Sequence, residues 1–406
     1  MHIAAQGDQP VILAYLKAEG LDVNEKDLKG GAALHWAAYM GNEMAAAVLL
    51  SWDVEKDFPD SDGFTPLHSA ALAGNSRITR NLLVKGASRQ VLDMKGRRPI
   101  DIARESKIEQ LVEMLKEPSF FAECGIKPPV RPYRRSFTTA CLYPLGFPAI
   151  VLLTLLFTIQ RKFHADLLYP GLVFYLFISL LSFLFFILAS CKDPGYLRPQ
   201  ADDTLLSLFQ RNEPYMVCPD CVVWRPARSR HCQCCDRCVE KFDHHCPWLS
   251  TCIGARNLGV FYVFLVCTEL SLAVTAAAGF LALLEGGETL LEMKGLAVKA
   301  VGGVLGVTAG LFLMPLSVLC CVQTQNFLAN TTTNERFGNK KKPDDDLNAS
   351  TASMYVDRRS FFRNCLSMCC NAPTGELPRK PAYHPMKEEE MESSRDLDTS
   401  NVQITQ

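Results

Sequence analysis

Four long stretches of this chain carry almost no charge, and they constrain its fold more than any other feature. They cover about residues 138–160, 167–191, 258–284 and 296–322. Each is long enough to cross the roughly 30 Å hydrocarbon core of a bilayer as a helix. The sequence therefore predicts four membrane-spanning helices, the third of which contains Glu269.

Basic residues gather on one side of the predicted membrane. They precede the first span, lie between the second and third spans, and follow the fourth: Arg131, Arg134, Arg135; Arg225, Arg228, Arg230, Arg237, Lys241; Arg336, Lys340, Lys341 and Lys342. The loop between the third and fourth spans is acidic. Because cytosolic loops carry the excess of Lys and Arg, both termini and the loop between spans two and three are predicted to be cytosolic. That compartment is reducing, which favours thiols and metal ligands over disulfides.

A repeat with a period of 33 residues occupies the N-terminal part. Gly30, Gly63 and Gly96 follow this spacing, and so do the blocks Ala-Leu-His-Trp-Ala, Pro-Leu-His-Ser-Ala and Pro-Ile-Asp-Ile-Ala. This period and the Thr-Pro-Leu-His-x-Ala core are typical of ankyrin repeats, in which stacked helix pairs bury their apolar faces against one another. Residues 1–116 are predicted to form this stack. Met1–Ala5 falls inside a block, so we expect the first repeat to be truncated.

Cysteine and histidine are concentrated between spans two and three. Eight of the 17 cysteines and three of the eight histidines lie between residues 218 and 252, many in Cys-x2-Cys spacing. Structural zinc is held by four Cys or His ligands at such spacings. Two closed sites would use eight of the eleven candidates and leave three, enough for a thiol nucleophile and a histidine base. The spacing alone does not say which three.

The tetrad Asp243-His244-His245-Cys246 inside this pattern resembles the DHHC-type protein S-acyltransferases, or palmitoyltransferases. The repeats in front resemble the ankyrin-bearing branch of that family. Three further motifs match: Asp193-Pro194-Gly195 after span two, the Thr-Thr-x-Glu pattern of Thr332, Thr333 and Glu335 after span four, and Arg363-Asn364 in an aromatic stretch. The resemblance covers about residues 137–370 in addition to the repeats. Ser250-Thr251 departs from it, because many members have asparagine before the last cysteine.

The resemblance implies the role of each candidate residue. One zinc ion would be held by Cys218, Cys221, His231 and Cys238, and the other by Cys232, Cys235, His245 and Cys252. Cys246 would be the nucleophile, His244 its general base and Asp243 the group that orients the imidazole. Both zinc ions would be structural, and acyl-CoA would be the co-substrate.

The resemblance and the patterns together predict a mostly α-helical protein: an ankyrin solenoid, then a four-helix polytopic membrane domain with a cytosolic zinc-bound module between spans two and three. The predicted parts are 1–116 repeats, 117–136 linker, 137–192 spans one and two, 193–257 the cysteine-rich module, 258–323 spans three and four, 324–371 the Thr-Thr-x-Glu and membrane-contacting segment, and 372–406 a disordered tail. The tail is charged, polar and proline-containing, as disordered segments are.

The implied function is transfer of a long-chain acyl group, palmitoyl above all, from acyl-CoA to cytosolic or juxtamembrane cysteines of other proteins. The implied partners are protein substrates docked on the repeats, acyl-CoA and membrane lipid. A net charge of −1 argues against nucleic acid. The resemblance implies an endomembrane location, with the Golgi favoured and the ER as the alternative.

Several residues have two interpretations. Cys234 is surplus: a free thiol or a further ligand. Glu269 and Ser271 face the bundle interior or act on the acyl chain. Arg225, Arg228, Arg230 and Arg256 bind CoA phosphates or are ordinary positive-inside charge. Cys365, Cys369 and Cys370 are S-acylation sites or free thiols. Trp36 packs in the repeat core or anchors a docked peptide.

Two other functions compete with acyl transfer. A catalytically silent membrane adaptor would work through its ankyrin repeats alone and would keep its function in a Cys246→Ser variant. A zinc-finger nucleic-acid binder is opposed by the membrane spans and by the near-neutral charge.

Overall fold

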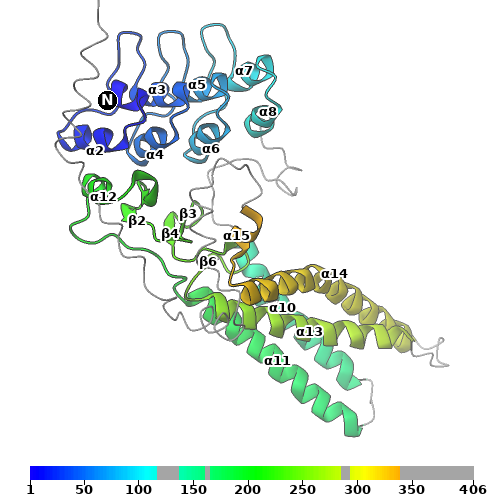
Figure 1. Ribbon diagram of the computed structural model, residues 1–406. Helices are drawn as coiled ribbons and strands as arrows, with labels where there is room; N and C mark the ends of the chain where they lie inside the picture. The colour runs from blue at the N-terminus through cyan, green and yellow to red at the C-terminus, as the bar shows by residue number, and fades with distance from the viewer. Residues whose placement is uncertain (117–136, 161–164, 285–292, 339–406) are drawn as a thin grey trace, which may run out of the picture. The chain divides into compact units, whose positions relative to one another are not determined.

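The computed structural model describes residues 1–116, 137–160, 165–284 and 293–338 (Figure 1). The predictions for the linker 117–136, for Arg363-Asn364 and the cysteines beside it, and for the tail 372–406 lie outside these residues. Helices dominate the described part, as the sequence predicted.

Four helix pairs form the N-terminal stack: α1 (His2–Gln6) with α2 (Pro10–Ala18), α3 (Ala33–Met40) with α4 (Glu43–Ser51), α5 (Pro66–Leu72) with α6 (Ser76–Val84), and α7 (Pro99–Glu105) with α8 (Glu109–Leu115). Small alanines in these helices are fully buried, which lets the pairs approach closely. The prediction of a repeat solenoid is confirmed.

The repeated histidine ties each repeat to the next. In His68, Nδ1 accepts the N–H of Thr65 at 3.1 Å, and Nε2 lies 3.1 Å from the carbonyl oxygen of Arg97, 29 residues further on. His35 makes the same pair of contacts with Ala32 and Phe64. Burial lowers the pKa of both imidazoles, so each stays neutral with one nitrogen accepting and the other donating.

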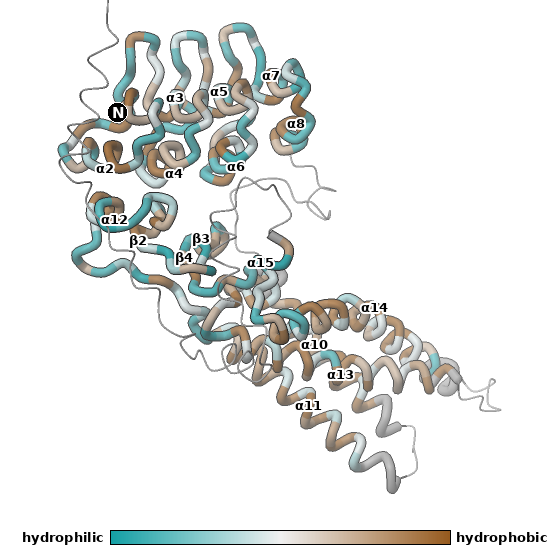
Figure 2. Tube along the Cα trace, viewed as in Figure 1, coloured by the Kyte–Doolittle hydropathy of each residue, from teal (hydrophilic) through white to brown (hydrophobic). Residues whose placement is uncertain are grey.

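Helices occupy all four predicted spans: α10 (Phe137–Gln160), α11 (Ala165–Cys191), α13 (Leu258–Leu284) and α14 (Met293–Ala329). Figure 2 shows the apolar character of the last three along most of their length. Among the described residues, three apolar segments are long enough to cross a membrane: Pro170–Cys191, Leu258–Leu281 and Lys299–Ala329. In α10 the apolar segment is shorter, Cys141–Leu156.

Polar side chains join these helices inside the bundle. Hydroxyl groups of α11 and α13 meet in pairs, with Ser179 Oγ 2.8 Å from Ser271 Oγ and Ser182 Oγ 2.6 Å from Thr268 Oγ1. Ser317 of α14 donates to Glu269 Oε1 of α13 at 2.6 Å. Glu269 and Ser271 therefore both have partners on neighbouring helices, as polar groups in apolar surroundings require.

The cysteine-rich module follows α11 and contains three two-stranded hairpins. A short helix, α12 (Leu205–Arg211), and a 3-10 turn, η1 (Pro214–Met216), precede them. The hairpins are β1 (Val217–Cys218) with β2 (Val223–Trp224), β3 (Arg230–Cys232) with β4 (Arg237–Val239), and β5 (His244–Cys246) with β6 (Thr251–Ile253). Helix α15 (Thr333–Gly338) follows α14.

Helices α13 and α14 cross at a glycine contact, which yields a prediction. A Cβ added at Gly279 would lie 2.6 Å from the carbonyl oxygen of Gly302 and from the backbone of Gly306, whereas a Cβ at Gly310 meets nothing within 4 Å. Forcing extra atoms into a packed contact costs about 1–3 kcal/mol. Gly279→Ala should therefore lower the thermal unfolding midpoint of the detergent-solubilised chain by several degrees.

The matched control is Gly310→Ala on the same helix pair. It should leave the midpoint unchanged or raise it slightly, because alanine favours helix over glycine. Equal midpoints for the two variants would contradict the close crossing.

Candidate functional site

Two clusters of three cysteines and one histidine lie in the cysteine-rich module. One contains Cys218, Cys221, His231 and Cys238, and the other Cys232, Cys235, His245 and Cys252; within each, the potential ligand atoms lie within 4.8 Å of one another. His231 Nδ1 is 3.2 Å from Cys221 Sγ, and His245 Nδ1 is 3.4 Å from Cys235 Sγ. Ligands about 2.1–2.3 Å from a tetrahedral zinc ion are separated by distances of this order. The donor set and the spacing both fit two structural zinc ions.

The hairpins explain why the ligands interleave along the sequence. His231 is paired across its hairpin with Cys238, and His245 with Cys252. Each Cys-x2-Cys pair belongs to a tight turn that brings both sulfurs to the same side, and a residue with positive φ follows each turn, Val222 (φ 50°) and Asp236 (φ 51°). The hairpin of β3 and β4 therefore supplies ligands to both clusters, whereas β1–β2 serves only the first and β5–β6 only the second, in the grouping that the resemblance implied.

Within each cluster some thiols favour the ionised form and one keeps its proton: hydrogen bonds with neighbouring cysteines raise the pKa of Cys238 and of Cys252. Hydrogen bonds from Cys221 and Cys238 hold the pKa of Cys218 far below that of an ordinary thiol. Hydrogen bonds from Cys234 and Cys235 do the same for the pKa of Cys232. Thiolate is the form that binds zinc, so Cys218 and Cys232 favour the state that a metal needs.

Cys246 belongs to neither cluster. It lies on β5 and is 6% exposed, in an apolar cluster with Leu249, Ile253 and Phe261. The imidazole of His244, on the same strand, is close enough to the Cys246 thiol to interact with it. The edge of that imidazole also meets the ring of Phe261, with 5.3 Å between centroids. A nucleophilic residue type and a basic one are thus adjacent at the boundary of the apolar bundle.

Asp243 holds this imidazole in place. His244 Nδ1 lies 2.7 Å from Asp243 Oδ2. The carboxylate also accepts hydrogen bonds from the Thr333 N–H (2.6 Å), the Thr333 hydroxyl (2.9 Å) and the Gln323 amide (3.0 Å). With Nδ1 bound to the carboxylate, Nε2 of His244 is the nitrogen that remains for a proton from Cys246.

The charges of Asp243, His244 and Cys246, together called the trio, reinforce one another. Burial lowers the pKa of His244, but its hydrogen bonds with Asp243 and Cys246 outweigh burial and raise that pKa to about 9. Burial raises the pKa of Asp243, but its contacts with His244 and Thr333 outweigh burial, so the net effect is a lowered pKa. At neutral pH the trio therefore holds an ionised Asp243 beside an imidazolium that can balance a thiolate on Cys246.

The Thr-Thr-x-Glu segment forms the start of α15. The Thr332 N–H donates to Glu335 Oε2 at 2.7 Å, and the Glu335 N–H donates to Thr332 Oγ1 at 3.2 Å. This reciprocal pair is a capping box. It leaves the N–H of Thr333, a first-turn group with no partner inside the helix, free to bind Asp243. The motif thus fixes a helix end against the trio.

The arginines of the loop have structural partners. Arg228 donates to both carboxylate oxygens of Glu335 and to the carbonyl of Asn330. Arg230 binds Asn334, and Arg256 lies 3.8 Å from Asp193. These contacts join the module to the ends of α11 and α14. In Arg228 these contacts occupy the guanidinium, which was one of the candidates for binding CoA phosphates.

Other predicted residues are placed as follows. Cys234 lies beside the second cluster without joining either ligand set. Trp36 donates its Nε1–H to Asp27 Oδ2 at 2.8 Å in the repeat stack. Asp193 Oδ1 accepts the N–H groups of Gly195 and Tyr196, so the Asp-Pro-Gly motif is a turn that ends α11. Ser250 has a φ of 52°, a conformation that asparagine adopts more readily than serine.

Sequence reasoning missed Gln323 and Asn326. Both are fully buried, and both contact Thr333. The signal was present: two amides three residues apart lie on one face near the end of an otherwise apolar span.

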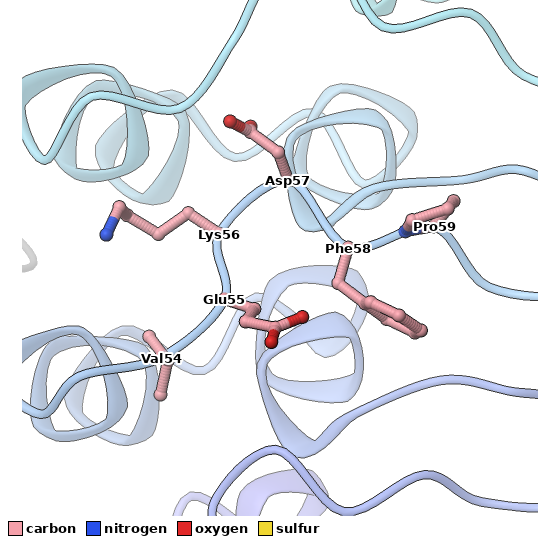
Figure 3. Close-up of a pocket in the computed structure, with 6 residues that line it drawn as sticks. All are labelled: Val54, Glu55, Lys56, Asp57, Phe58 and Pro59. Carbon is pink, nitrogen blue, oxygen red and sulfur yellow. The ribbon is translucent and has the colours of Figure 1, made fainter.

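A surface pocket of about 440 Å³ lies on the ankyrin repeats and is lined by residues 54–59 (Figure 3). Lys26 Nζ lies 4.1 Å from the ring centroid of Phe58, and Asp57 accepts the N–H of Ser88. The lining contains no Cys or His, so the pocket is not a second candidate for thiol chemistry.

Comparison with known proteins decides the family. The DHHC palmitoyltransferase family matches residues 211–340, and the family of ankyrin repeats in three copies matches residues 1–93. Palmitoyltransferase ZDHHC18 of Rattus norvegicus is 30% identical over 270 residues, which cover 57% of this chain and 67% of that protein. The chain belongs to the DHHC palmitoyltransferase family.

Two further relatives match this chain over only part of their own length. Palmitoyltransferase Hip14 of Drosophila melanogaster is 30% identical over 267 residues, 58% of this chain and 42% of that protein. Palmitoyltransferase akr1 of Aspergillus oryzae is 32% identical over 150 residues, 35% of this chain and 19% of that protein. The chain thus spans less than half the length of these two relatives.

The two clusters predict the metal content of the purified chain. Cys238→Ser and Cys252→Ser each remove one ligand from a different cluster, so each should lower bound zinc from about two ions per chain to about one. Elemental analysis of the chain purified without chelator measures this.

Cys234→Ser is the control, because Cys234 neighbours the second cluster but is not among its four grouped residues. It should keep about two ions. Loss of zinc from this variant alone would overturn the assignment of ligands.

Proposed function

We propose that this chain is a protein S-acyltransferase that carries a long-chain acyl group, palmitoyl above all, from acyl-CoA to cysteine thiols of other proteins. The observation that carries the proposal is Cys246: a buried thiol outside both cysteine clusters, beside an imidazole that a buried carboxylate holds. An extra thiol in a purely structural zinc module would need no such partner.

The first step loads the enzyme. The proton of Cys246 lies on His244, as the imidazolium, and the thiolate attacks the carbonyl carbon of the acyl-CoA thioester. A new carbon–sulfur bond forms to Cys246 while the bond to the CoA sulfur breaks, and the departing thiolate takes the proton from His244. Covalent catalysis of this kind divides one difficult transfer into two easier ones.

The second step transfers the group. A substrate thiol gives its proton to His244 and attacks the acyl carbon on Cys246. Cys246 leaves as a thiolate and recovers the proton from the imidazolium. Asp243 remains ionised throughout and keeps Nε2 of His244 directed at the reacting sulfur. Zinc, when bound, would supply rigidity to the hairpins that carry these residues.

The surroundings of Cys246 suit an apolar substrate. Cys246 belongs to one apolar cluster with Leu249, Ile253, Leu258 and Phe261, and with Cys320 and Phe327 of α14. We assign the acyl chain to this side and the soluble part of acyl-CoA to the cytosolic side of the module.

The remaining parts of the proposal concern organisation and place. The chain would contain ankyrin repeats at 1–116, a linker at 117–136, spans at 137–192 and 258–323, the catalytic module at 193–257, and cytosolic segments at 324–371 and 372–406. Both termini would face the cytosol of an endomembrane, the Golgi ahead of the ER. The ankyrin repeats would recruit protein substrates, because repeat stacks present extended binding surfaces.

Acyl-enzyme formation tests the nucleophile directly. Purified wild-type chain incubated with a clickable long-chain acyl-CoA should take a label that hydroxylamine removes. Cys246→Ser should take none, and His244→Ala should load at least about 100-fold more slowly, since an acid–base group contributes factors of this order. Zinc content of each variant serves as the control for folding.

A zinc-loaded wild type without label, or equal label in Cys246→Ser, would contradict the proposal. The membrane adaptor that works through its repeats would then be the better account.

The raised pKa of His244 predicts a pH dependence. The imidazolium that pairs with the Cys246 thiolate and protonates the departing CoA sulfur persists below about pH 9 in the wild type, so the loading rate should fall only as the pH rises past that value and this proton is lost. Asp243→Asn removes the negative charge that raises the pKa. The fall should then begin near the ordinary histidine value, about pH 6.5. Loading rates from about pH 6 to 9.5 measure both profiles, and coincident profiles would show that Asp243 does not act on His244.

A further inference from the structure

Gln323 is a buried amide in the last third of α14. Its side chain is fully buried, and Nε2 donates to Asp243 Oδ2 at 3.0 Å and to Thr333 Oγ1 at 3.0 Å. Because the Thr333 hydroxyl itself donates to the same carboxylate oxygen, the three side chains form a closed triangle of hydrogen bonds.

The direction of the amide is settled by its partners. An ionised carboxylate only accepts hydrogen bonds, so the NH2 end of Gln323 must face Asp243. The Oε1 end is then buried and has no hydrogen-bond partner among the described residues. A buried acceptor without a partner is unfavourable. An apolar side chain at this position would remove that penalty. The presence of an amide is therefore explained by the hydrogen bonds that its NH2 group donates.

Joining α14 to α15 does not require Gln323. Asn326, one turn further along α14, already donates to Thr333 Oγ1 and accepts from Arg336 Nε. The contact that Gln323 makes and Asn326 does not is the one with Asp243. The distinctive partner of Gln323 is therefore the carboxylate that holds His244.

The same face of α14 also contributes to the apolar cluster of the site. Cys320, Gln323 and Phe327 follow the i, i+3, i+7 spacing of one helix face. Cys320 and Phe327 belong to the apolar cluster that contains Cys246, while Gln323 binds Asp243. The position of α14 thus bears on both the thiol and the carboxylate.

We propose that Gln323 is a positioning residue of the acyl-transfer site: its amide fixes the Asp243 carboxylate and thereby aims the His244 imidazole at Cys246. This inference rests on the proposed function and deepens it. It makes the end of span four part of the catalytic apparatus, although Gln323 touches neither the acyl group nor the reacting sulfur.

The test compares two variants of Gln323 in the full-length, detergent-solubilised chain. Gln323→Met keeps the length of the side chain but removes the donor. Gln323→His keeps an N–H donor at nearly the same reach. Gln325→Met is the matched control, an exposed glutamine on the same helix. Rates of Cys246 loading are measured against acyl-CoA concentration, together with zinc content.

Gln323→Met should lower the maximal loading rate about ten-fold while the KM for acyl-CoA changes less than about two-fold, because the lost hydrogen bond orients the base and does not bind acyl-CoA. Gln323→His should recover most of the rate, and Gln325→Met should match the wild type. All variants should keep the zinc content of the wild type. An unchanged rate in Gln323→Met, an equal loss in Gln323→His, or a loss that follows zinc would overturn the proposal.

Alkylation of Cys246 by iodoacetamide at a fixed pH, without acyl-CoA, separates this inference from the proposed function. Gln323→Met should slow alkylation several-fold relative to Gln325→Met. A wild type that takes no acyl label would refute acyl transfer, and alkylation would still decide whether Gln323 governs the reactivity of the thiol. Equal alkylation rates in the two variants would refute the role of Gln323.

Discussion

The carboxylate of Asp243 is the point at which the hairpin module, the end of α14 and the start of α15 are joined. A charged group with 1% of its surface exposed is tolerated only when donors replace the water that it has lost. Here four donors do so, from His244, Gln323 and both the N–H and hydroxyl of Thr333. Hydrogen bonds to charged groups contribute about 1.5–3 kcal/mol each, so removal of one member leaves a strongly unfavourable buried charge. Catalytic geometry and attachment of the module to the bundle therefore depend on the same contacts.

The cysteine-rich module has little else to hold its shape. Its strands are two or three residues long, and its small buried clusters consist largely of the cysteines themselves. A fold of this kind cannot supply its own stability through an apolar core, and ligation of metal is the usual substitute. Because the hairpin of β3 and β4 contributes ligands to both sets, ordering of one cluster helps to order the other. Cys246 lies on β5, directly after His245, and so its position depends on the second cluster.

Much of this architecture could be predicted from the sequence because it is periodic or compositional. The 33-residue repeat indicated the stack, and the charge-free stretches indicated helices that the structure places within a few residues of the predicted bounds at most ends. The number of zinc ligands followed from residue counts, but their grouping did not, since any cysteine is chemically equivalent to any other until the hairpins fold. Gln323 escaped notice because a polar residue near the end of a span usually marks only the interface with water. Arg228 was considered for CoA phosphates, and the structure instead pairs it with Glu335, 107 residues away.

The pairing of Arg228 with Glu335 explains why the Thr-Thr-x-Glu motif contains a glutamate. Glu335 serves the capping box through Thr332 and, with the same carboxylate, accepts two hydrogen bonds from Arg228. The side chains of both partners are less than one-fifth exposed, so solvent screens this bidentate pair less than a surface ion pair. The glutamate therefore fixes α15 in two directions, along its axis through the cap and against the module through the arginine. With the helix end held in this way, the N–H of Thr333 meets Asp243 without any further adjustment of the loop. The trio is thus oriented by α15, and the position of α15 is itself fixed by its capping box and by Arg228.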